Sequence, residues 1–382
     1  MARLKIAYIG GGSTRGAGTM ASFIEQGENF TGSEIVLVDL NAERLELIRD
    51  LAQRMASAKG VDITVSATTD RRAGLDGCDA VLTSYRPGGF EARVLDERIP
   101  LTHGVIGQET QGPGGFFMAL RSIHVMQGIV DDVAVACPGA RIFNYTNPVN
   151  IVAQAVTDHS DVPFVSLCEG PIIYPEELAE AAGLDPARLD VASVGLNHGS
   201  WSVRHQYDGR DLLPLLQEAY ARRGADPSLR PQTRRMLRLA SVMGAVPSEY
   251  FQYYYFEDEV LRELTDKPTT RAEDILGWVP SYWEHYVEQA HSDHPELDPS
   301  RSRGGIDELE LAIDCIDAVF NDRGETLPVN VPNRGSIPGF PDTLVVETLG
   351  ECDANGIRPL PMPGLPTHLR GLVEALGEYQ QA

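Results

Sequence analysis

The feature that most constrains the fold is the start of the chain, where a short apolar run leads through glycines into an amphipathic segment. Residues 4–9 (LKIAYI) have the character of a buried strand, residues 10–12 are three glycines, and residues 17–26 fit a helix. A second strand-like run at residues 34–39 (EIVLVD) is followed by another amphipathic helix. This order of strand, glycine turn, helix and strand is typical of the first unit of a doubly wound parallel sheet.

The alternation of strand and helix continues to about residue 200. Further strand-like runs lie at residues 61–68, 79–84, 142–148, 163–168 and 190–196, with a loop expected over 86–115 and a helix over 116–136. The later part reads as mainly helical from about residue 205, with a strand pair near 325–332 and 343–349 and a closing helix near 364–378. We predict an α/β fold in two domains: a Rossmann-like doubly wound parallel sheet over residues 1–200, and a mainly helical α+β domain for substrate binding and oligomerisation over residues 201–382.

Charge and cysteine content restrict the partners and the compartment. The 382 residues include 32 basic and 55 acidic side chains, and the net charge of −23 repels nucleic acids and anionic membranes. The five cysteines are scattered and have no CxxC spacing, so no disulfide framework is expected and a reducing cytoplasm suits the chain. No signal peptide or membrane span is expected, because the apolar runs are too short.

The first glycine turn predicts a dinucleotide site that takes NAD. Its glycines let the backbone approach a pyrophosphate at a helix N-terminus, and an acid at the end of the second strand can bind ribose hydroxyls and disfavours a 2′-phosphate. The match to the GxGxxG fingerprint is partial, because its third glycine would fall at Arg15. The alternative is a turn that only packs strand against helix, with Asp39 capping the next helix. The predicted cofactor-binding residues of this region are Gly10, Gly11, Gly12, Ser13, Thr14, Arg15 and Asp39.

Several polar or glycine-rich segments follow at strand ends, where side chains can converge on a nicotinamide ring. They are residues 85–93 (YRPGGFEAR), 104–110 (GVIGQET), 112–116 (GPGGF), 144–148 (NYTNP), 167–169 (LCE) and 195–201 (GLNHGSW). Together with residues 247–254 (PSEYFQYY), 303–305 (RGG), 329–333 (VNVPN) and 359–361 (PLP), they resemble glycoside hydrolase family 4, the NAD- and manganese-dependent glycosidases related to lactate and malate dehydrogenases. The likeness covers nearly the whole chain, and it is specific because the motifs occur together.

The resemblance implies a hydrolysis that passes through a transient oxidation of the sugar. NAD+ takes a hydride from C3, a tyrosine removes the acidified C2 proton, the aglycone leaves, water adds, and the hydride returns. An obvious carboxylate pair is not required, since this family is an exception to the paired-carboxylate scheme. Two other functions stay open: an NAD-dependent hydroxy-acid or sugar dehydrogenase that releases NADH, and a non-catalytic NAD-binding sensor.

By the same resemblance, Cys168 and His198 are the ligands of a divalent metal, Mn2+, whose remaining positions are filled by sugar hydroxyls or water. One thiolate and one imidazole make a weak site, so the metal is expected to be lost easily. The residues alone leave a structural alternative open, in which Cys168 is a buried thiol and His198 a core histidine.

The resemblance also makes Tyr250 the base, while Glu169 follows the metal-binding cysteine, where an acid can protonate the leaving group. A phenol with a pKa of about 10 needs a metal or another cation nearby to act as a base at neutral pH. Aromatic packing is the alternative for Tyr250, and the choice among the tyrosines of residues 250–255 is open. Glu169 departs from the Asp, Asn or His typical of the family, which leaves the sugar and anomer open, and its alternative role is to cap the helix near Pro175.

The remaining predicted contacts involve the substrate, a small glycoside with an anionic group such as phosphate or sulfonate on C6. Arginines can hold such a group by bidentate contacts, and their alternative is ion pairing with Glu91, Glu97 or Asp307. Asn147 is also expected near the cofactor, with closure of the turn before Pro148 as its alternative role. The predicted substrate-binding residues are Arg86, Arg93, Glu109, Asn147, Asn197 and Arg303. A homodimer or homotetramer is expected from the resemblance.

Overall fold

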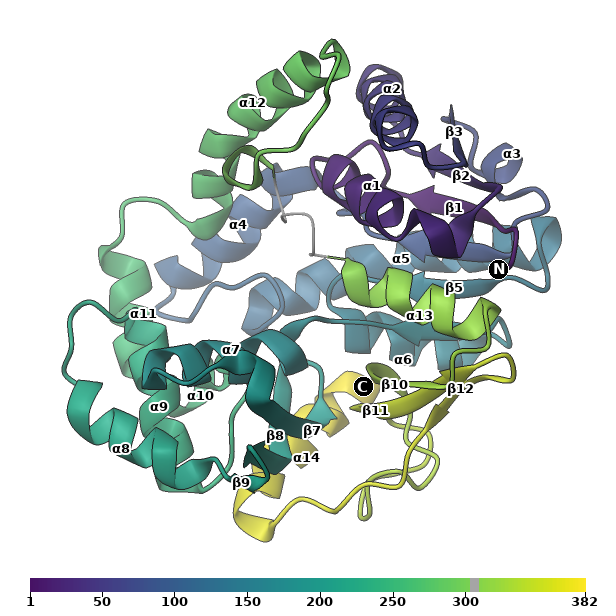
Figure 1. Cartoon of the computed structure of the whole chain (residues 1–382). Coiled ribbons are helices and arrows are strands. Elements are labelled where there is room, and N and C mark those ends of the chain that lie inside the picture. Colours follow the sequence, from purple (N-terminus) through teal and green to yellow (C-terminus); the bar gives the residue numbers. More distant parts are fainter. Residues whose placement is uncertain (303–308) are drawn as a thin grey trace.

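The computed structural model describes residues 1–302 and 309–382 (Figure 1). The strands are β1 (Lys5–Ile9), β2 (Ser33–Val38), β3 (Ile63–Thr68), β4 (Ala80–Thr83), β5 (Arg141–Asn144), β6 (Phe164–Ser166), β7 (Leu189–Leu196), β8 (Gly199–Tyr207), β9 (Arg210–Asp211), β10 (Glu325–Pro332), β11 (Val345–Asp353) and β12 (Gly356–Pro359). Within the described residues these 12 strands form one sheet in the order β3-β2-β1-β4-β5-β6-β10-β11-β7-β8-β9, with β12 beside β11.

The helices cover both faces of this sheet. They are α1 (Gly16–Glu25), α2 (Ala42–Lys59), α3 (Arg71–Leu75), α4 (Gly89–Thr102), α5 (Gly112–Ala136), α6 (Val149–His159), α7 (Gly170–Ala182), α8 (Leu213–Arg223), α9 (Pro231–Met243), α10 (Gln252–Tyr255), α11 (Glu257–Asp266), α12 (Arg271–Ala290), α13 (Glu310–Phe320) and α14 (Thr367–Gln381). Short 3-10 turns lie at Gly27–Phe30, Pro186–Arg188, Glu249–Phe251 and Pro299–Arg301.

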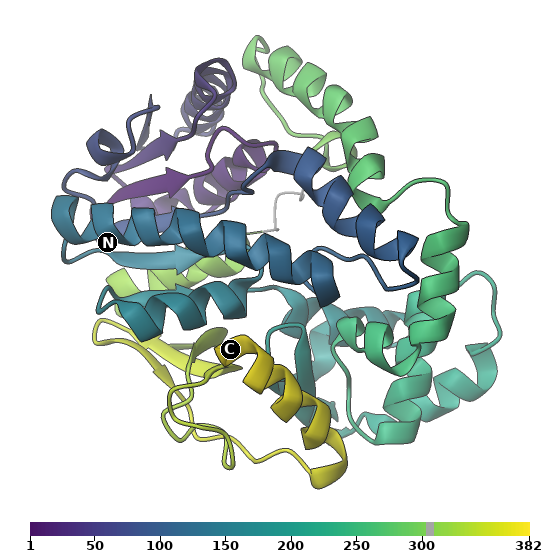
Figure 2. The same ribbon diagram turned by 180° about the vertical axis from the view of Figure 1, so that it is seen from behind.

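The parallel half of the sheet confirms the predicted doubly wound α/β fold. Strands β3, β2, β1, β4, β5 and β6 are all parallel. Alternate residues of β1 point to opposite faces: Ile6 and Tyr8 pack in a core with α1, α2 and α13, whereas Ala7 and Ile9 pack in a core with α5 and α6. Figure 2 shows α5 and α6 lying across the second of these faces. The carboxyl ends of the parallel strands therefore meet at one edge, where such sheets bind their ligands.

The strands that follow β6 are antiparallel, which the sequence patterns did not predict. β10 joins β6 through Asn330 and Ser166, β11 pairs with β10, and β7 joins β11 through Gly195 and Glu347. The run 190–196 thus belongs to an antiparallel hairpin with β8 and not to the parallel sheet. Strands from the end of the chain lie between β6 and β7, so that part of the strand order does not follow the chain order.

One other sequence expectation is wrong. The loop expected over residues 86–115 contains α4, whose glycines at the start and Pro100 near the end obscured the helical pattern. The segment after residue 205 is mainly helical, as expected, and it also contains the short strands β9 and β12, which the patterns did not indicate.

A third core lies between β7, β8 and the helices α7, α8, α9 and α14. Trp201 is fully buried at its centre and stacks on Phe251 with ring centroids 4.5 Å apart. β8 crosses the domain boundary placed at residue 200, and the division into residues 1–200 and 201–382 stays a prediction. In the described part of the chain, the helices lack the combination of length and apolar character that a membrane span requires.

Candidate active site

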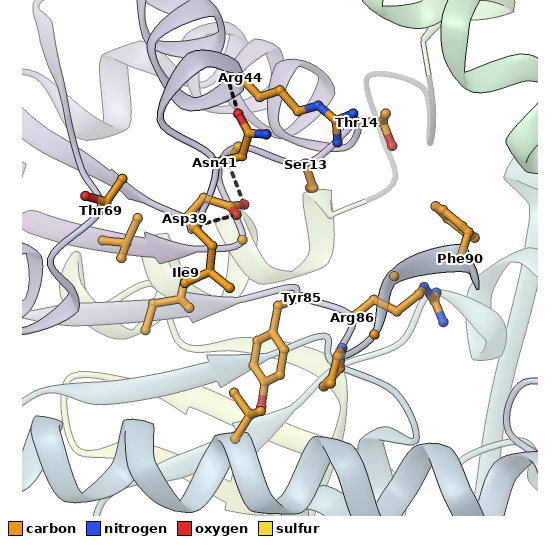
Figure 3. A pocket seen from close by; sticks show the side chains of 18 of the residues that line it. Ile9, Ser13, Thr14, Asp39, Asn41, Arg44, Thr69, Tyr85, Arg86 and Phe90 are labelled. Carbon is orange, nitrogen blue, oxygen red and sulfur yellow. Dashed lines mark hydrogen bonds between the residues drawn. The ribbon is translucent and has the colours of Figure 1, made fainter. Parts of the chain in front are cut away.

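A cavity of about 490 Å³ lies at the carboxyl ends of β1, β2 and β4 (Figure 3). The loop after β4 forms its floor, and helix α12 closes the opposite side. Its lining includes Gly10, Gly12, Ser13, Thr14, Asp39, Arg44, Thr69, Arg71, Tyr85, Arg86, Phe90, Leu276, Val279 and Trp283.

The glycine turn approaches its neighbours too closely for side chains. Gly10 has a φ of +99°, and a Cβ placed there would lie 2.1 Å from the carbonyl oxygen of Ser84. A Cβ on Gly16 would lie 2.1 Å from the carbonyl oxygen of Gly11. Gly16 therefore takes the packing role of the third fingerprint glycine, one position after Arg15. This turn is one residue longer than the fingerprint, which explains the partial match.

The side chain of Asp39 is held by backbone donors at the mouth of the turn. Its Oδ2 accepts from the Gly12 N–H at 3.0 Å and its Oδ1 from the Leu40 N–H at 2.6 Å (Figure 3). Helix α2 is capped instead by Asn41, whose side chain accepts from the Arg44 N–H at 2.9 Å. The alternative in which Asp39 caps this helix is therefore wrong.

Four of the predicted cofactor residues besides Asp39 line the cavity, and three do not. Gly10, Gly12, Ser13 and Thr14 belong to the lining. Gly11 lies behind the turn, with its N–H donating to the Val38 carbonyl, and Arg15 stands at the start of α1. Asn147 is placed after β5, where its carbonyl accepts from Ser122 Oγ at 2.8 Å.

Helix α12 is a part of this site that the sequence did not indicate. Leu276, Val279 and Trp283 turn toward the cavity, and the Arg44 guanidinium lies 5.0 Å from the centre of the Trp283 ring. Tyr286 donates from its hydroxyl to the Thr14 carbonyl at 2.7 Å. The amphipathic pattern of α12 predicts a buried face but not the cavity that this face closes.

Cys168 and His198 meet although 30 residues separate them in the chain. Cys168 Sγ lies 3.8 Å from His198 Nε2, and His198 Nδ1 is hydrogen-bonded to Thr110 Oγ1 at 2.9 Å. His198 sits in the turn between β7 and β8 with a φ of +63°. Among residues 1–302 and 309–382, no group of three or more His, Cys, Asp or Glu side chains converges as a metal site would. Thr110 was missed, since its motif indicates only a loop.

Burial shifts the pKa values of these two groups in opposite directions. It raises the pKa of the Cys168 thiol to about 12, and it lowers the pKa of the His198 imidazole to about 3. His198 is therefore neutral at physiological pH, the form in which an imidazole nitrogen can bind a metal. Cys168 is a neutral thiol unless a cation stabilises its thiolate.

Among the tyrosines of residues 250–255, Tyr250 lies against this pair. Its ring stacks on the His198 ring with centroids 3.5 Å apart and planes within 6° of parallel. Tyr254 points elsewhere and donates to Gln111 Oε1 at 2.5 Å, and Tyr255 packs edge-on to Trp201. Burial, followed by the charge of Glu249, raises the pKa of Tyr250 well above its ordinary value. A phenol in this position needs a nearby cation to act as a base.

Glu169 lies beside Cys168 and interacts with Tyr145. The Tyr145 hydroxyl donates to Glu169 Oε1 at 2.5 Å. Glu169 precedes α7, but its side chain makes no hydrogen bond that caps this helix. The predicted alternative of a capping role is therefore wrong.

The predicted arginines gather around one buried carboxylate. Arg86 forms an ion pair with Glu109, and Arg93 Nη1 lies 2.6 Å from Glu109 Oε2. Arg93 also pairs with Glu97 at 2.6 Å, as the ion-pair alternative expected. Burial raises the pKa of Glu109, but Arg86 and Arg93 outweigh that effect and hold it well below its ordinary value. Arg303 and Asp307 lie outside the described residues.

Asn197 is buried and contacts a residue that the sequence did not indicate. Asn197 Nδ2 donates to Glu347 Oε2 at 3.0 Å, and Ser200 Oγ donates to Glu347 Oε1 at 2.6 Å. Burial raises the pKa of Glu347 to about 7. An apolar strand pattern with one acid gives no signal for this contact, because it depends on which strands are neighbours.

Comparison with known proteins places this geometry in a family. Residues 5–184 match the model of the Family 4 glycosyl hydrolases, and residues 193–382 match that of the C-terminal domain of Family 4 glycosyl hydrolases. The chain belongs to this family. This membership confirms the resemblance inferred from the motifs and identifies the chain as a hydrolase of glycosidic bonds.

Relatives and solved structures of this family 4 glycosyl hydrolase cover almost the whole chain. A probable 6-phospho-beta-glucosidase of Bacillus subtilis is 33% identical over 99% of this chain and 87% of its own length. The crystal structure of a 6-phospho-alpha-glucosidase from gut microorganisms, in complex with NAD and Mn2+, superposes with a TM-score of 0.86 at 25% identity, covering 100% of this chain and 89% of that one. Malate dehydrogenase of Plasmodium falciparum shares the fold, with a TM-score of 0.60 at 11% identity, covering 99% of this chain and 97% of that one.

Proposed function

We propose that this family 4 glycosyl hydrolase cleaves glycosides phosphorylated on C6, using NAD+ and a divalent metal such as Mn2+. The observation that carries the proposal is the meeting of the side chains of Cys168, His198 and Tyr250. Arg86 connects the two regions, since it lines the cavity and pairs with Glu109, the neighbour of Thr110. The 6-phospho-glucosidase names of similar proteins, and the solved relative in complex with NAD and Mn2+, support it.

The cavity fits a dinucleotide. A Cβ at Gly10 or Gly16 would collide with backbone, so the turn is built for close approach at the N-terminus of α1. Asp39 lies at the rim, where its carboxylate can bind ribose hydroxyls. When bound, NAD+ supplies the acceptor for the C3 hydride of the sugar and returns that hydride at the end of the reaction.

The Cys168 and His198 pair fits a weakly held divalent cation. A neutral imidazole and a sulfur 3.8 Å apart can bind one ion together, and this donor set leaves positions for sugar hydroxyls or water. When bound, such a cation acts as a Lewis acid on the sugar oxygens and favours the thiolate of Cys168. Thr110 holds the other ring nitrogen of His198, which fixes the direction of the metal-binding nitrogen.

The protein's own acid and base groups surround this pair. We propose that Tyr250 removes the C2 proton, which requires a neighbouring cation to offset the rise in its pKa caused by burial. We propose Glu169 as the acid for the leaving group, with its carboxyl oriented by the Tyr145 hydroxyl. Tyr145 cannot readily lose a proton itself, since burial and then the charge of Glu169 raise its pKa well above the ordinary value.

The substrate contacts follow from the arginine cluster. We propose that Arg86 and Arg93 bind the C6 phosphate while Glu109 fixes their guanidinium groups. Asn147 and Asn197 are proposed to contact sugar hydroxyls. The Asn197 Oδ1 atom is buried without a hydrogen-bond partner among the described residues, so it can accept from a ligand. Arg303 stays a proposed contact on the basis of its motif alone.

Assembly and location are further parts of the proposal. Leu95 and Ile99 on α4, and Phe117 and Leu120 on α5, each expose more than half of their surface. We propose that these apolar side chains contact another copy of the chain, in a homodimer or homotetramer. We propose a cytoplasmic location, because the metal-binding role of Cys168 requires a reduced thiol.

One assay tests the function. The protein is mixed with Mn2+, NAD+ and nitrophenyl glycosides of both anomers, in 6-phospho, 6-sulfo and neutral forms, in D2O. We expect cleavage of 6-phospho substrates that requires NAD+, gives no net NADH and places deuterium at C2. Stoichiometric NADH would instead identify a dehydrogenase, and NAD+ binding without turnover would identify a sensor.

A further inference from the structure

The turn that carries His198 adopts a backbone conformation that a histidine seldom takes. Leu196 and Gly199 are paired at the ends of β7 and β8, so Asn197 and His198 alone form the hairpin turn. His198 has a φ of +63°, in the left-handed region that most residues other than glycine avoid. Such a conformation persists only when surrounding contacts hold it.

Glu347 supplies contacts on both sides of this histidine. Its Oε2 accepts from Asn197 Nδ2 at 3.0 Å, and its Oε1 accepts from Ser200 Oγ at 2.6 Å. The carboxylate thus binds the residue before His198 and the residue two positions after it. Glu347 is only 2% exposed, so water does not compete for these bonds.

The strand order places Glu347 between the segments that carry Cys168 and His198. A row of paired residues crosses the sheet from Ser166 on β6, through Asn330 on β10 and Glu347 on β11, to Gly195 on β7. Cys168 follows the first residue of this row by two positions, and His198 follows the last by three. Glu347 therefore lies in the sheet between the strand that precedes Cys168 and the strand that precedes His198.

Among the residues that the structure describes, the charge of Glu347 has no cationic partner. Across residues 1–302 and 309–382, the ion pairs of arginine, lysine and histidine side chains do not include Glu347. Its polar contacts are the neutral side chains of Asn197 and Ser200, with Asn330 beside it. Buried carboxylates are normally paired with a cation or placed near a metal ion.

We propose that Glu347 is a positioning residue of the metal site: it fixes the turn that presents His198, and it places a negative charge under Cys168 and His198 that offsets the charge of a bound divalent cation. The inference rests on the proposed function, and it goes further by assigning a role to a residue that need not touch the ion. A residue with only a structural role would affect folding alone, whereas the proposed role affects the affinity for the metal ion.

The test measures Mn2+ binding to the metal-free protein, with free Mn2+ followed by electron paramagnetic resonance. Glu347→Gln keeps the size of the side chain but removes its charge and one acceptor. We expect the variant to unfold cooperatively and to bind Mn2+ about 10- to 100-fold more weakly than the unchanged protein, the usual effect of losing such an outer contact.

Thr348→Val is the matched control. Thr348 is the next residue of β11, is equally buried at 1% exposure, and hydrogen-bonds Ser336 Oγ at 2.9 Å on the other face of the sheet. We expect it to lose some stability and to keep its Mn2+ affinity. If Thr348→Val weakens Mn2+ binding as much as Glu347→Gln does, the effect is one of general stability and the proposal is overturned.

Ser200→Ala provides a second test that keeps the charge. It removes one bond to the carboxylate, and we expect Mn2+ binding about two- to tenfold weaker. If Glu347→Gln does not fold, this variant decides the question, and unchanged affinity would overturn the positioning role. Unchanged affinity in Glu347→Gln would overturn the inference and leave the proposed function intact, whereas a wild-type protein that binds no Mn2+ would overturn both.

Discussion

At the scale of single residues, burial shifts the pKa values of the site's groups in opposite directions. The low-polarity surroundings that keep His198 neutral also keep Cys168 protonated and Tyr250 a phenol. A divalent cation is the one addition that favours the reactive form of all three, since it takes the imidazole nitrogen and stabilises both anions.

At this scale Cys168→Ser should remove Mn2+ binding, because the serine hydroxyl stays neutral and cannot replace the anionic thiolate as a ligand. The loss should appear in a titration of the metal-free protein followed by electron paramagnetic resonance. Cys137→Ser is the control, since it also removes a buried thiol but lies at the end of α5. Mn2+ binding that persists in Cys168→Ser would refute the ligand assignment.

Asp39→Ala should weaken NAD+ binding about 10- to 100-fold, because charge-assisted bonds to the ribose hydroxyls are lost. Calorimetric titration with NAD+ measures the effect. The control is Asp62→Ala, which removes an exposed acid just before β3 and should leave the affinity unchanged. Equal affinities in Asp39→Ala and the unchanged protein would show that Asp39 serves only to hold the Gly12 and Leu40 amides.

At the scale of secondary-structure elements, the first prediction concerns the close approach of a helix to the glycine turn. Gly16→Ala should abolish NAD+ binding or folding, because its Cβ would lie 2.1 Å from the Gly11 carbonyl oxygen where α1 meets the turn. Gly277→Ala is the matched change, since that helical glycine of α12 has nothing within 4 Å of an added Cβ. It should raise the free energy of unfolding by about 0.5–1 kcal/mol. Thermal unfolding with and without NAD+ separates the two results.

The segment that carries Tyr250 should make stability depend on pH. Burial, and then the charge of Glu177, raises the pKa of Glu249 from 4.5 to about 7. Because the folded-state pKa is the higher one, this group's stabilisation is complete below pH 4.5 and is lost as the pH rises through 7. Glu249→Gln should therefore match the unchanged protein at low pH and be more stable above neutrality, by about 2 kcal/mol after allowance for its partial exposure. Denaturant unfolding across this pH range is the measurement, and a constant difference would contradict the assignment.

Local motifs explain what could be predicted from the sequence. The glycine turn, Asp39, Cys168, His198 and Tyr250 each lie in a short segment whose residue types indicate their chemistry. Thr110 and Glu347 could not be predicted, because their roles depend on which strands and loops become neighbours. α4 was missed for a different reason: its glycines and proline resemble a loop. The insertion of β10 and β11 between β6 and β7 depends on the pairing of strands far apart in the chain, which local periodicity does not encode.

For the whole molecule, the net charge of −23 opposes self-association, so an oligomer must rely on apolar contacts. We expect the pair of changes Leu95→Glu and Phe117→Glu to yield a monomer in size-exclusion chromatography with light scattering. Val242→Glu, at an even more exposed apolar site on α9, should not change the assembly. Added salt should strengthen association of the unchanged chain by screening its repulsion. A monomer at every salt concentration would contradict the proposed assembly.

β10 and β11 lie near the end of the chain, so the sheet that carries the proposed reacting centre is completed late in synthesis. The glycine turn forms from the first segments of the chain and α12 adds to its cavity later, but the strands that join β6 to β7 are absent until residues 325–353 have left the ribosome. A chain that ends before residue 325 would therefore hold a dinucleotide turn without the two strands that connect the segments of Cys168 and His198.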